Sequence, residues 1–474
     1  MYHSRLAFAL AMAALAAILL PSPLPAQITF QRTYGGDTTD EAYSVQQTAD
    51  GGYIVVGYTT YHHTENADVY VVKTDAYADT LWTRTFGTDS TYECAFSVEQ
   101  TTDGGYIIAG GSGGRFYLIK TNASGDTLWT RTYGGPESGL AYSVQQTMDG
   151  GYIIAGFLYD GVEVCARLVK TDADGDSLWA RTYGGTNGGT GCSVHQTVDS
   201  GYVIVGLTWP SSGASDVYLI KTNSEGYSQW TRTYDFGYDD VGYAVRQTTD
   251  SGYMIAGSSG SDGQTLILLR TDANGDTEWT RTFPSMWTDV GGSVKQTNDG
   301  GFVVAGTTFA HGYDVLLMKL DSDGDTLWTR TFGGALPDEG CSVQQTADGG
   351  YIIAGYAMSF GAGGEDVYLI KTDSLGRTTA VAEPRTSPTR APGLSLTCEP
   401  NPFAGTTTIR LPPFALRHSP LTLRMYDSQG RVVLSRQAST SSFRLSTSDL
   451  PSGAYFVRLD ANGLHATARL VLQR

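Results

Sequence analysis

Two acid-rich turns contain the first residues in this chain that could bind a metal ion. The segments DADGD at 172–176 and DSDGD at 321–325 carry closely spaced carboxylates, which are preferred ligands of calcium. Their glycine is out of place for an EF-hand loop, which needs it after the third acidic position. Equivalent segments read NASGD, NSEGY, DANGD and DAYAD, so the middle residue varies freely. We therefore interpret them as hairpin turns, with calcium binding as the alternative.

Two pairs of adjacent residues offer other chemistry. Asp239 and Asp240 could serve as acid and base, and His62 and His63 could ligate a metal. Adjacent side chains in a loop are more often simply solvated. The seven histidines are scattered, and the chain has neither a GxSxG motif nor a Cys/His spacing typical of zinc sites. The sequence therefore predicts no catalytic residue, no metal site and no cofactor.

Three sets of polar residues recur in every copy of an internal repeat. A catalytic site needs unlike residues at one place, whereas a residue found seven times does the same structural job seven times. We expect the aspartates to hydrogen-bond within turns, and the arginines and lysines to pair across strands. The sets are Asp50, Asp103, Asp149, Asp199, Asp250, Asp299 and Asp348; Arg32, Arg84, Arg131, Arg181, Arg232, Arg281 and Arg330; and Lys73, Lys120, Lys170, Lys221, Arg270, Lys319 and Lys371.

The repeat itself predicts the fold. Blocks such as SVQQTADGGYIVVG occur seven times, and their second glutamine marks the register at Gln47, Gln100, Gln146, Gln196, Gln247, Gln296 and Gln345. Each copy holds four strand signals separated by DGG-type and xGD turns. Four antiparallel strands in seven copies predict an all-β chain with a seven-bladed β-propeller over residues 27–376. A linear β-solenoid is the alternative.

The two ends of the repeat array complement each other. Ala380 stands where the last copy should have the tryptophan of its fourth strand, at Trp82, Trp129 and Trp179 in earlier copies. The segment ITFQRTYGGD at 28–37 matches that missing strand. We expect this N-terminal strand to complete the last blade, which would close the ring and remove exposed sheet edges.

Loops that differ between repeats are the expected place for binding. The strand order puts the uniform turns on one face and the variable loops on the other, where a scaffold becomes specific. Aromatic side chains beside carboxylates and amides suit contacts with carbohydrate or peptide; the alternative is that they only cover the blade ends. The candidate ligand-binding residues are Tyr61, His62, Tyr92, Tyr159, Trp209, Tyr238, Asp239, Trp287, His311, Tyr313 and Phe360.

Composition excludes some classes of function. The chain is rich in Gly (59) and Tyr (29), has 17% charged residues, and carries a formal net charge of −17, which argues against a nucleic-acid partner. It has five cysteines. Cys192 and Cys341 share one repeat position with Tyr43, Phe96 and Tyr142, so we interpret them as small core hydrophobes rather than a disulfide frame.

The N-terminus is typical of an export signal. Arg5 precedes the apolar run 6–20, and PSPLPA ends at Ala26, so residues 1–26 are predicted to be a signal peptide. A membrane anchor is the alternative. No later stretch is long and apolar enough for a transmembrane segment.

Residues 394–474 form a separate module after a Pro- and Thr-rich linker at 377–393. Seven short alternating strands, from LSLTCE to ARLVLQR, predict a small immunoglobulin-like β-sandwich. EPNPFAGTTTIRL, LTLRMYDSQGRVV, DLPSGAYFVRL and RLVLQR resemble, in order, the type A C-terminal sorting domain (Por secretion tail) of type IX secretion cargo. The motif residues that carry the resemblance are Asn401, Pro402, Phe403, Gly430, Gly453 and Tyr455.

The resemblance implies an export route. It implies passage from the periplasm through the outer membrane by the type IX machinery, a Bacteroidota-like host, and a protein that is secreted or held on the outer cell surface. With no catalytic constellation in the repeats, we expect a non-enzymatic binding module for an extracellular glycan, another polymer or a surface protein. A secreted polysaccharide-active hydrolase or lyase is the alternative, and a passive surface-layer component is a third possibility.

Overall fold

The computed structural model describes residues 27–60, 66–88, 91–134, 138–159, 161–184, 188–210, 213–260, 265–284, 286–287, 293–309, 312–378, 397–399, 406–410, 421–426, 432–438, 442–446, 450–461 and 464–472. The chain divides into two compact units, Met1–Glu383 and Pro384–Arg474. The predicted signal peptide lies outside the described residues, as does the linker beyond residue 378. In the described parts of the chain, every regular element is a strand. None of them contains a helix with the length and apolar character needed to cross a bilayer.

The first unit is built from repeated four-stranded antiparallel sheets, here called repeat sheets and numbered in chain order. Repeat sheet 1 comprises β2 (Asp40–Gln47), β3 (Tyr53–Thr60), β4 (Ala67–Thr74) and β5 (Thr80–Phe86). Repeat sheet 2 comprises β6 (Glu93–Gln100), β7 (Tyr106–Ser112), β8 (Arg115–Thr121) and β9 (Thr127–Tyr133). Repeat sheet 3 comprises β10 (Ser138–Gln146), β11 (Tyr152–Tyr159), β12 (Val164–Thr171) and β13 (Ser177–Tyr183). Repeat sheet 4 comprises β14 (Thr190–Gln196), β15 (Tyr202–Thr208), β16 (Asp216–Thr222) and β17 (Ser228–Tyr234).

The later repeats follow the same plan with one irregularity. Repeat sheet 5 comprises β18 (Asp240–Gln247), β19 (Tyr253–Ser259), β20 (Thr265–Thr271) and β21 (Thr277–Pro284); repeat sheet 6 comprises β23 (Val294–Gln296), β24 (Phe302–Thr308), β25 (Asp314–Leu320) and β26 (Thr326–Phe332). The short strand β22 (Met286–Trp287) pairs with both β20 and β24, so these two repeats form one continuous sheet. Repeat sheet 7 comprises β27 (Asp338–Gln345), β28 (Tyr351–Ala357), β29 (Asp366–Thr372) and β1 (Phe30–Tyr34).

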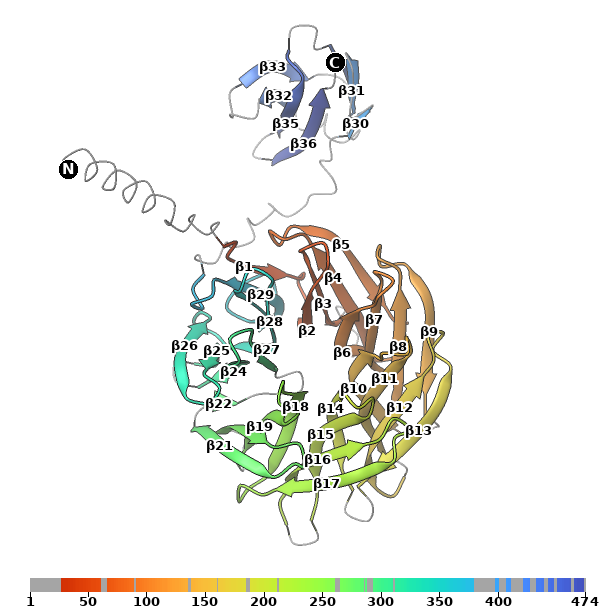
Figure 1. Ribbon diagram of the computed structural model, residues 1–474. Coiled ribbons are helices and arrows are strands. Elements are labelled where there is room, and N and C mark those ends of the chain that lie inside the picture. Colours follow the sequence, from red (N-terminus) through yellow and green to blue (C-terminus); the bar gives the residue numbers. More distant parts are fainter. Residues whose placement is uncertain are drawn as a thin grey trace, which may run out of the picture. The chain divides into compact units, whose positions relative to one another are not determined.

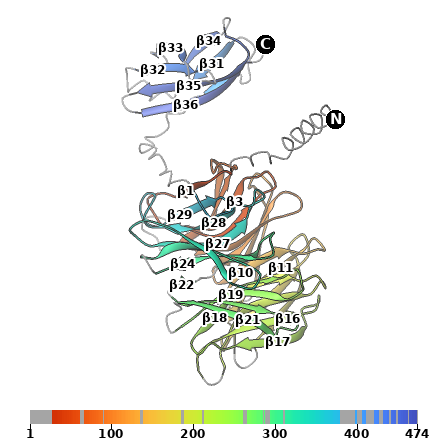
Figure 2. The same ribbon diagram turned by 60° about the vertical axis from the view of Figure 1, so that its left-hand side comes forward.

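The N-terminal strand completes the last repeat, as the sequence predicts. Strand β1 pairs antiparallel with β29 from Phe30↔Lys371 to Tyr34↔Val367, and it lies beside β29 in both views (Figures 1 and 2). Hydrogen bonds also join repeat sheet 7 to repeat sheet 1; for example, Gln47 N–H donates to Gln344 Oε1 at 2.7 Å, and Ala347 N–H donates to Gln47 Oε1 at 2.8 Å. The first and last repeats are therefore neighbours in space.

Apolar packing joins each repeat sheet to the next. The second strand of each repeat is buried on both faces, as in YIVVG at 53–57, because it is covered by a neighbouring sheet on either side. Separate core clusters bridge consecutive repeats, and one of them joins Ala42 and Tyr53 of repeat sheet 1 to Ile352 and Leu369 of repeat sheet 7. The repeated sheets are consistent with the blades of a β-propeller.

The xGD turns are hairpin turns whose glycine is a packing residue. In the turn at 172–176, Asp172 Oδ1 accepts the N–H groups of Asp174 and Asp176 at 3.0 and 2.8 Å. Gly175 has φ of 79°, and a Cβ there would lie 2.7 Å from the ring of Trp129 in the preceding repeat. The aspartate that resembles a calcium ligand therefore holds a turn on which the neighbouring tryptophan packs.

The recurring cations are scaffold residues, with one change from expectation. Lys73, which is 2% exposed, donates to Asp50 in the neighbouring turn at 2.9 Å, and each of the other repeats has the equivalent ion pair. We expected the arginine set to pair across strands within a sheet. Arg131 instead lies over the Trp129 ring of its own strand, 5.5 Å from the centroid, and reaches Asp176 of the next repeat. The tryptophan two residues earlier provides a flat apolar face for the guanidinium.

The second unit holds two antiparallel sheets. One contains β30 (Thr397–Glu399), β31 (Thr406–Arg410) and β34 (Ser442–Ser446). The other contains β33 (Val432–Ala438), β32 (Leu421–Tyr426), β35 (Gly453–Ala461) and β36 (Leu464–Leu472). Ile409, Leu423, Met425, Val457 and Leu472 are buried.

Candidate functional site

The loops predicted to bind a ligand lie at one end of the repeat sheets. Each repeat is an antiparallel meander, so the connections after its second and fourth strands share the end at which its first strand begins. Tyr61, His62, His63 and His311 lie outside the described residues, and of Trp287 only the backbone, in β22, is described. Five of the others have exposed rings: Tyr92 (46%), Tyr159 (42%), Trp209 (39%), Tyr238 (59%) and Tyr313 (44%).

The structure does not bring these aromatic residues together. Tyr313 packs on Phe309 at 4.7 Å and Phe360 on Tyr368 at 5.6 Å within their own repeats, whereas Tyr92 packs on Tyr58 of the preceding repeat at 6.0 Å. Trp209 belongs to repeat sheet 4 and Tyr159 to repeat sheet 3. The described members of this set are therefore distributed from repeat to repeat.

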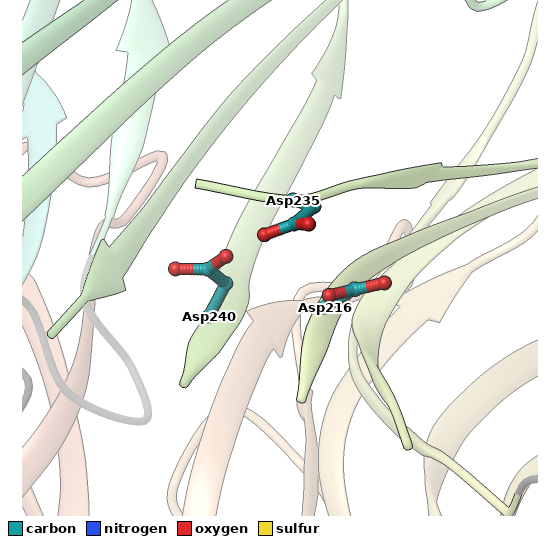
Figure 3. Close-up of side chains that lie close together, drawn as sticks. All are labelled: Asp216, Asp235 and Asp240. Atoms are coloured by element: carbon teal, nitrogen blue, oxygen red, sulfur yellow. The ribbon is translucent and has the colours of Figure 1, made fainter. Parts of the chain in front are cut away.

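Asp240 belongs to a cluster of three carboxylates. Oxygens of Asp216, Asp235 and Asp240 lie within 4.8 Å of one another (Figure 3). Burial raises the pKa of Asp240. Asp240 Oδ2 accepts the N–H of Phe236 at 2.6 Å, and its counterparts Asp40 and Asp338 accept the N–H four residues earlier in the same way, so these aspartates hold the loops between repeats.

Its neighbour Asp239 also has a local role. Asp239 Oδ1 accepts the N–H of Ser215 at 3.0 Å, which ties together the loops that follow β15 and β17. The structure thus places this pair in hydrogen bonds that hold the loops between strands.

A ring of identical side chains binds the repeats together near the DGG turns. The register glutamine of each repeat accepts a backbone N–H from the turn of the preceding repeat. Examples are Ala49 N–H to Gln100 Oε1 at 2.8 Å and Val198 N–H to Gln247 Oε1 at 2.9 Å. The other five bonds are those of Gln47, Gln146, Gln196, Gln296 and Gln345. All seven repeats use this residue in the same way, so it is scaffold.

The position just before that glutamine behaves differently. We call its seven residues the chamber ring: Gln46, Glu99, Gln145, His195, Arg246, Lys295 and Gln344. Where the residue is Gln or Glu, its side-chain oxygen accepts the N–H of the next repeat's register glutamine. The distances are 2.5 Å from Gln46, 2.5 Å from Glu99, 2.7 Å from Gln145 and 2.7 Å from Gln344.

Three consecutive repeats break this pattern. His195, Arg246 and Lys295 stand at the same position in repeat sheets 4, 5 and 6. Arginine and lysine have only donors, so they cannot accept the backbone N–H. In the described residues, no hydrogen bond joins any of the three to the next register glutamine. A structural link present at four positions has thus been replaced by basic side chains at three.

These side chains line a cavity of about 250 Å³. Its wall is formed by the first strands of the repeats, and it includes the whole chamber ring together with Tyr43, Phe96, Tyr142, Cys192 and Tyr243. These last residues are pushed inward by β-bulges, as at Ala42/Ser44 and Ala95/Ser97. Cys192 thus lines the cavity, and it is also one of the buried hydrophobic residues, as we predicted. Cys192 and Cys341 are buried and form no disulfide.

Basic groups outnumber acidic groups in the lining of the cavity. Burial, with the charges of Arg246 and Lys295, lowers the pKa of His195 to about 3, so its imidazole is neutral at ordinary pH. Burial and the neighbouring Arg246 charge hold the pKa of Lys295 well below its usual value. Glu99 is the one carboxylate among the lining residues, and burial raises its pKa. Two basic side chains and a histidine thus face a single acid.

Alignment of the seven repeats with one another carries a signal for this cavity. Within the block SVxQT, the residue x reads Gln, Glu, Gln, His, Arg, Lys and Gln, while the residues around it hardly change. This variation lies inside a recurring strand, whereas we expected binding residues in the variable loops. The sequence pattern does not indicate that the seven x side chains converge on one cavity.

The C-terminal unit provides the evidence for identity. In the described part of this unit, Tyr455 is 4% exposed, and its hydroxyl donates to Pro451 O at 2.7 Å, which fixes the turn that contains Gly453. Asn401, Pro402, Phe403 and Gly430 lie outside the described residues. Residues 400–473 match the family described as secretion system C-terminal sorting domain. The chain therefore carries a sorting domain of type IX secretion. Its sorting domain implies export to the cell surface or the extracellular space and interaction with the type IX machinery.

The solved structures that match this chain are distant from it. PorZ, a surface component of the type IX secretion system of Porphyromonas gingivalis, is 11% identical, with a TM-score of 0.43 over 96% of this chain and 61% of PorZ. A puromycin hydrolase is 13% identical, with a TM-score of 0.49 over 83% of this chain and 61% of that enzyme. A Bacteroides caccae protein of unknown function is 12% identical, with a TM-score of 0.39 over 59% of this chain and 93% of its own. No curated protein matches the sequence.

Proposed function

We propose that this cargo is a non-enzymatic binding module that acts outside the cell on a glycan or another extracellular polymer. In this proposal its first unit is a seven-bladed β-propeller closed by β1, its second unit is an immunoglobulin-like sandwich, and residues 1–26 direct it to the periplasm of a Bacteroidota-like host. The variable loops would carry the more extended contacts with the polymer, through exposed rings such as those of Trp209 and Tyr238.

One observation supports binding above all: the chamber ring. Its residues differ between repeats, although the position allows a hydrogen bond from the N–H of the next register glutamine. Four of the residues accept this hydrogen bond, and the other three do not. Two basic groups opposed in the cavity by a single acid, Glu99, reduce stability, and such a cost is typical of functional sites. The recurring aspartates, lysines and register glutamines, by contrast, all have scaffold roles.

The alternative function, a polysaccharide hydrolase or lyase, has one feature in its favour. Glu41 is 7% exposed; it accepts the hydroxyl of Tyr43 at 2.5 Å and also that of Tyr58. Burial raises its pKa to about 7, as in a general acid. Tyr43 lines the cavity, so Glu41 stands next to the proposed site.

A retention screen separates the two functions. The chain from Gln27 to the C-terminus is passed over a panel of immobilised neutral and acidic polysaccharides, and both retained protein and released reducing ends are measured. Retention without product supports the binding module. Reducing ends that are released by the wild type but not by Glu41→Gln would favour the hydrolase or lyase over the binding module. A protein that is not retained and releases no reducing ends would refute both functions.

A further inference from the structure

The chamber ring defines a binding site for an anion. We propose that Arg246 and Lys295, with His195 beside them, hold a carboxylate, sulfate or phosphate group of at most monosaccharide size inside the cavity. The source is either a small free anion or the acidic residue of a polysaccharide. This inference deepens the proposed function, because it assigns a charge to the ligand of the same unit.

Arg246 is already oriented for such a ligand. Its Nη1 donates to Val245 O at 2.6 Å and to Ser193 Oγ at 3.4 Å, which fixes the plane of the guanidinium. In the described residues, its Nε and Nη2 donors make no hydrogen bond. These two donors form one edge of the guanidinium and can bind two oxygens of a carboxylate or sulfate at once.

Lys295 supplies a second, independent positive group. It belongs to β23 of the neighbouring repeat, and its ammonium has no hydrogen bond or ion pair among the described residues. The lysines of the repeats' third strands, by contrast, each pair with a turn aspartate, as Lys319 does with Asp299 at 3.0 Å. Among the described residues Lys295 is therefore a local exception in having no hydrogen-bonded or ion-paired partner, and an anion between Lys295 and Arg246 would relieve the repulsion between these two basic groups.

The cavity limits what can enter. Its volume of about 250 Å³ is below the range of roughly 300–1,000 Å³ typical of sites for drug-sized ligands. Tyr43, Phe96 and Tyr142 form aromatic walls, with rings of neighbouring repeats 5.0 and 5.2 Å apart. One acidic sugar residue, with a charged group for the cations and an apolar face for the rings, matches this lining better than a long chain segment.

The repeats themselves suggest the variants that test the site. Glutamine occupies the chamber ring in three repeats, so Arg246→Gln and Lys295→Gln replace each cation by a residue that already fits there. Arg84→Gln is the matched control, because it removes the same charge from an exposed side chain outside the cavity. Glu99→Gln removes the one acid of the cavity wall.

Calorimetric titration of the chain from Gln27 to its C-terminus with sulfate, glucuronate and glucose measures the site. We expect sulfate and glucuronate to bind and glucose not to bind. The Arg246→Gln/Lys295→Gln double variant should bind them about tenfold to a hundredfold more weakly, Arg84→Gln should bind as the wild type does, and Glu99→Gln should bind more tightly. A wild type that binds no anion, or a double variant that melts normally and binds equally well, would overturn the inference.

Polymers distinguish the two sources of the anion and separate this inference from the proposed function. Retention on polygalacturonate but not on dextran, lost in the double variant, assigns the site to an acidic polysaccharide. Titration by glucuronate or sulfate without retention on any polymer supports the anion site but refutes glycan binding. Retention that the double variant keeps overturns the anion site and leaves the binding module standing.

Discussion

His195 offers the sharpest test of how the cavity is built. The structure holds its imidazole neutral, with a pKa of about 3, whereas an unfolded histidine has a pKa of about 6.5. Between these values the unfolded chain binds a proton that the folded chain does not, so stability falls as the pH falls below about 6.5. At about pH 5 the unfolded imidazole is protonated roughly thirtyfold over its neutral form, which costs the folded state about 2 kcal/mol.

His195→Gln removes this penalty and adds a bond. Glutamine at this position accepts the next repeat's N–H in three other repeats, as Gln145 does from Gln196, so the variant should gain about 1 kcal/mol at any pH. Thermal melting of both proteins at about pH 7.5 and pH 5 measures the effect. The variant's advantage in melting temperature should grow by about 3 °C on acidification, given the unfolding entropy of a unit this large. An advantage that is the same at both pH values would refute the claim that His195 is held neutral.

The remaining predictions concern the scaffold. Asp366→Asn should stabilise the protein at about pH 8 by up to about 4 kcal/mol and have no such effect at about pH 4, because burial raises the pKa of this carboxyl to about 7 and ionisation then opposes folding; melting curves at both pH values test this. Asp149→Asn should cost about 1–3 kcal/mol in denaturant unfolding, since it weakens the pairing of the buried Lys170. Asp126→Asn, in an exposed pair, should cost less than about 1 kcal/mol. Deletion of residues 28–36 should lower the melting temperature by more than 10 °C, roughly, because it leaves the edge of β29 unpaired; an unchanged melting temperature would show that β1 does not hold the last repeat.

Much of the fold follows from local sequence patterns. Alternating strands and DGG turns have a strong period, and the orphaned segment at 28–37 could be matched to the missing strand near Ala380 by its letters alone. The pairing of Phe30 with Lys371 confirms that match. The sorting domain could likewise be identified from ordered motifs. Short-range turn chemistry and repetition made these predictions possible.

The site was harder to predict because it is formed by residues from different repeats that meet in one cavity. Residues such as Glu99 and Arg246 are far apart in the chain, and only the packing of repeat against repeat brings them into one cavity. The loop aromatics, chosen for their residue types, are distributed from repeat to repeat. Asp240 was considered for its carboxylate, but its neighbours make it a loop-holding residue. Local patterns reveal elements, whereas a site requires knowing which elements face each other.

A crystal structure determined from crystals grown with selenate tests most directly the central claim that the cavity binds an anion. Selenate has the charge and shape of sulfate, and its anomalous signal marks its position without ambiguity. The account predicts a peak in the cavity within hydrogen-bond distance of the Arg246 Nε/Nη2 edge and the Lys295 ammonium, and no such peak in the Arg246→Gln/Lys295→Gln variant. Selenate bound only elsewhere on the protein, with the cavity empty, would contradict it.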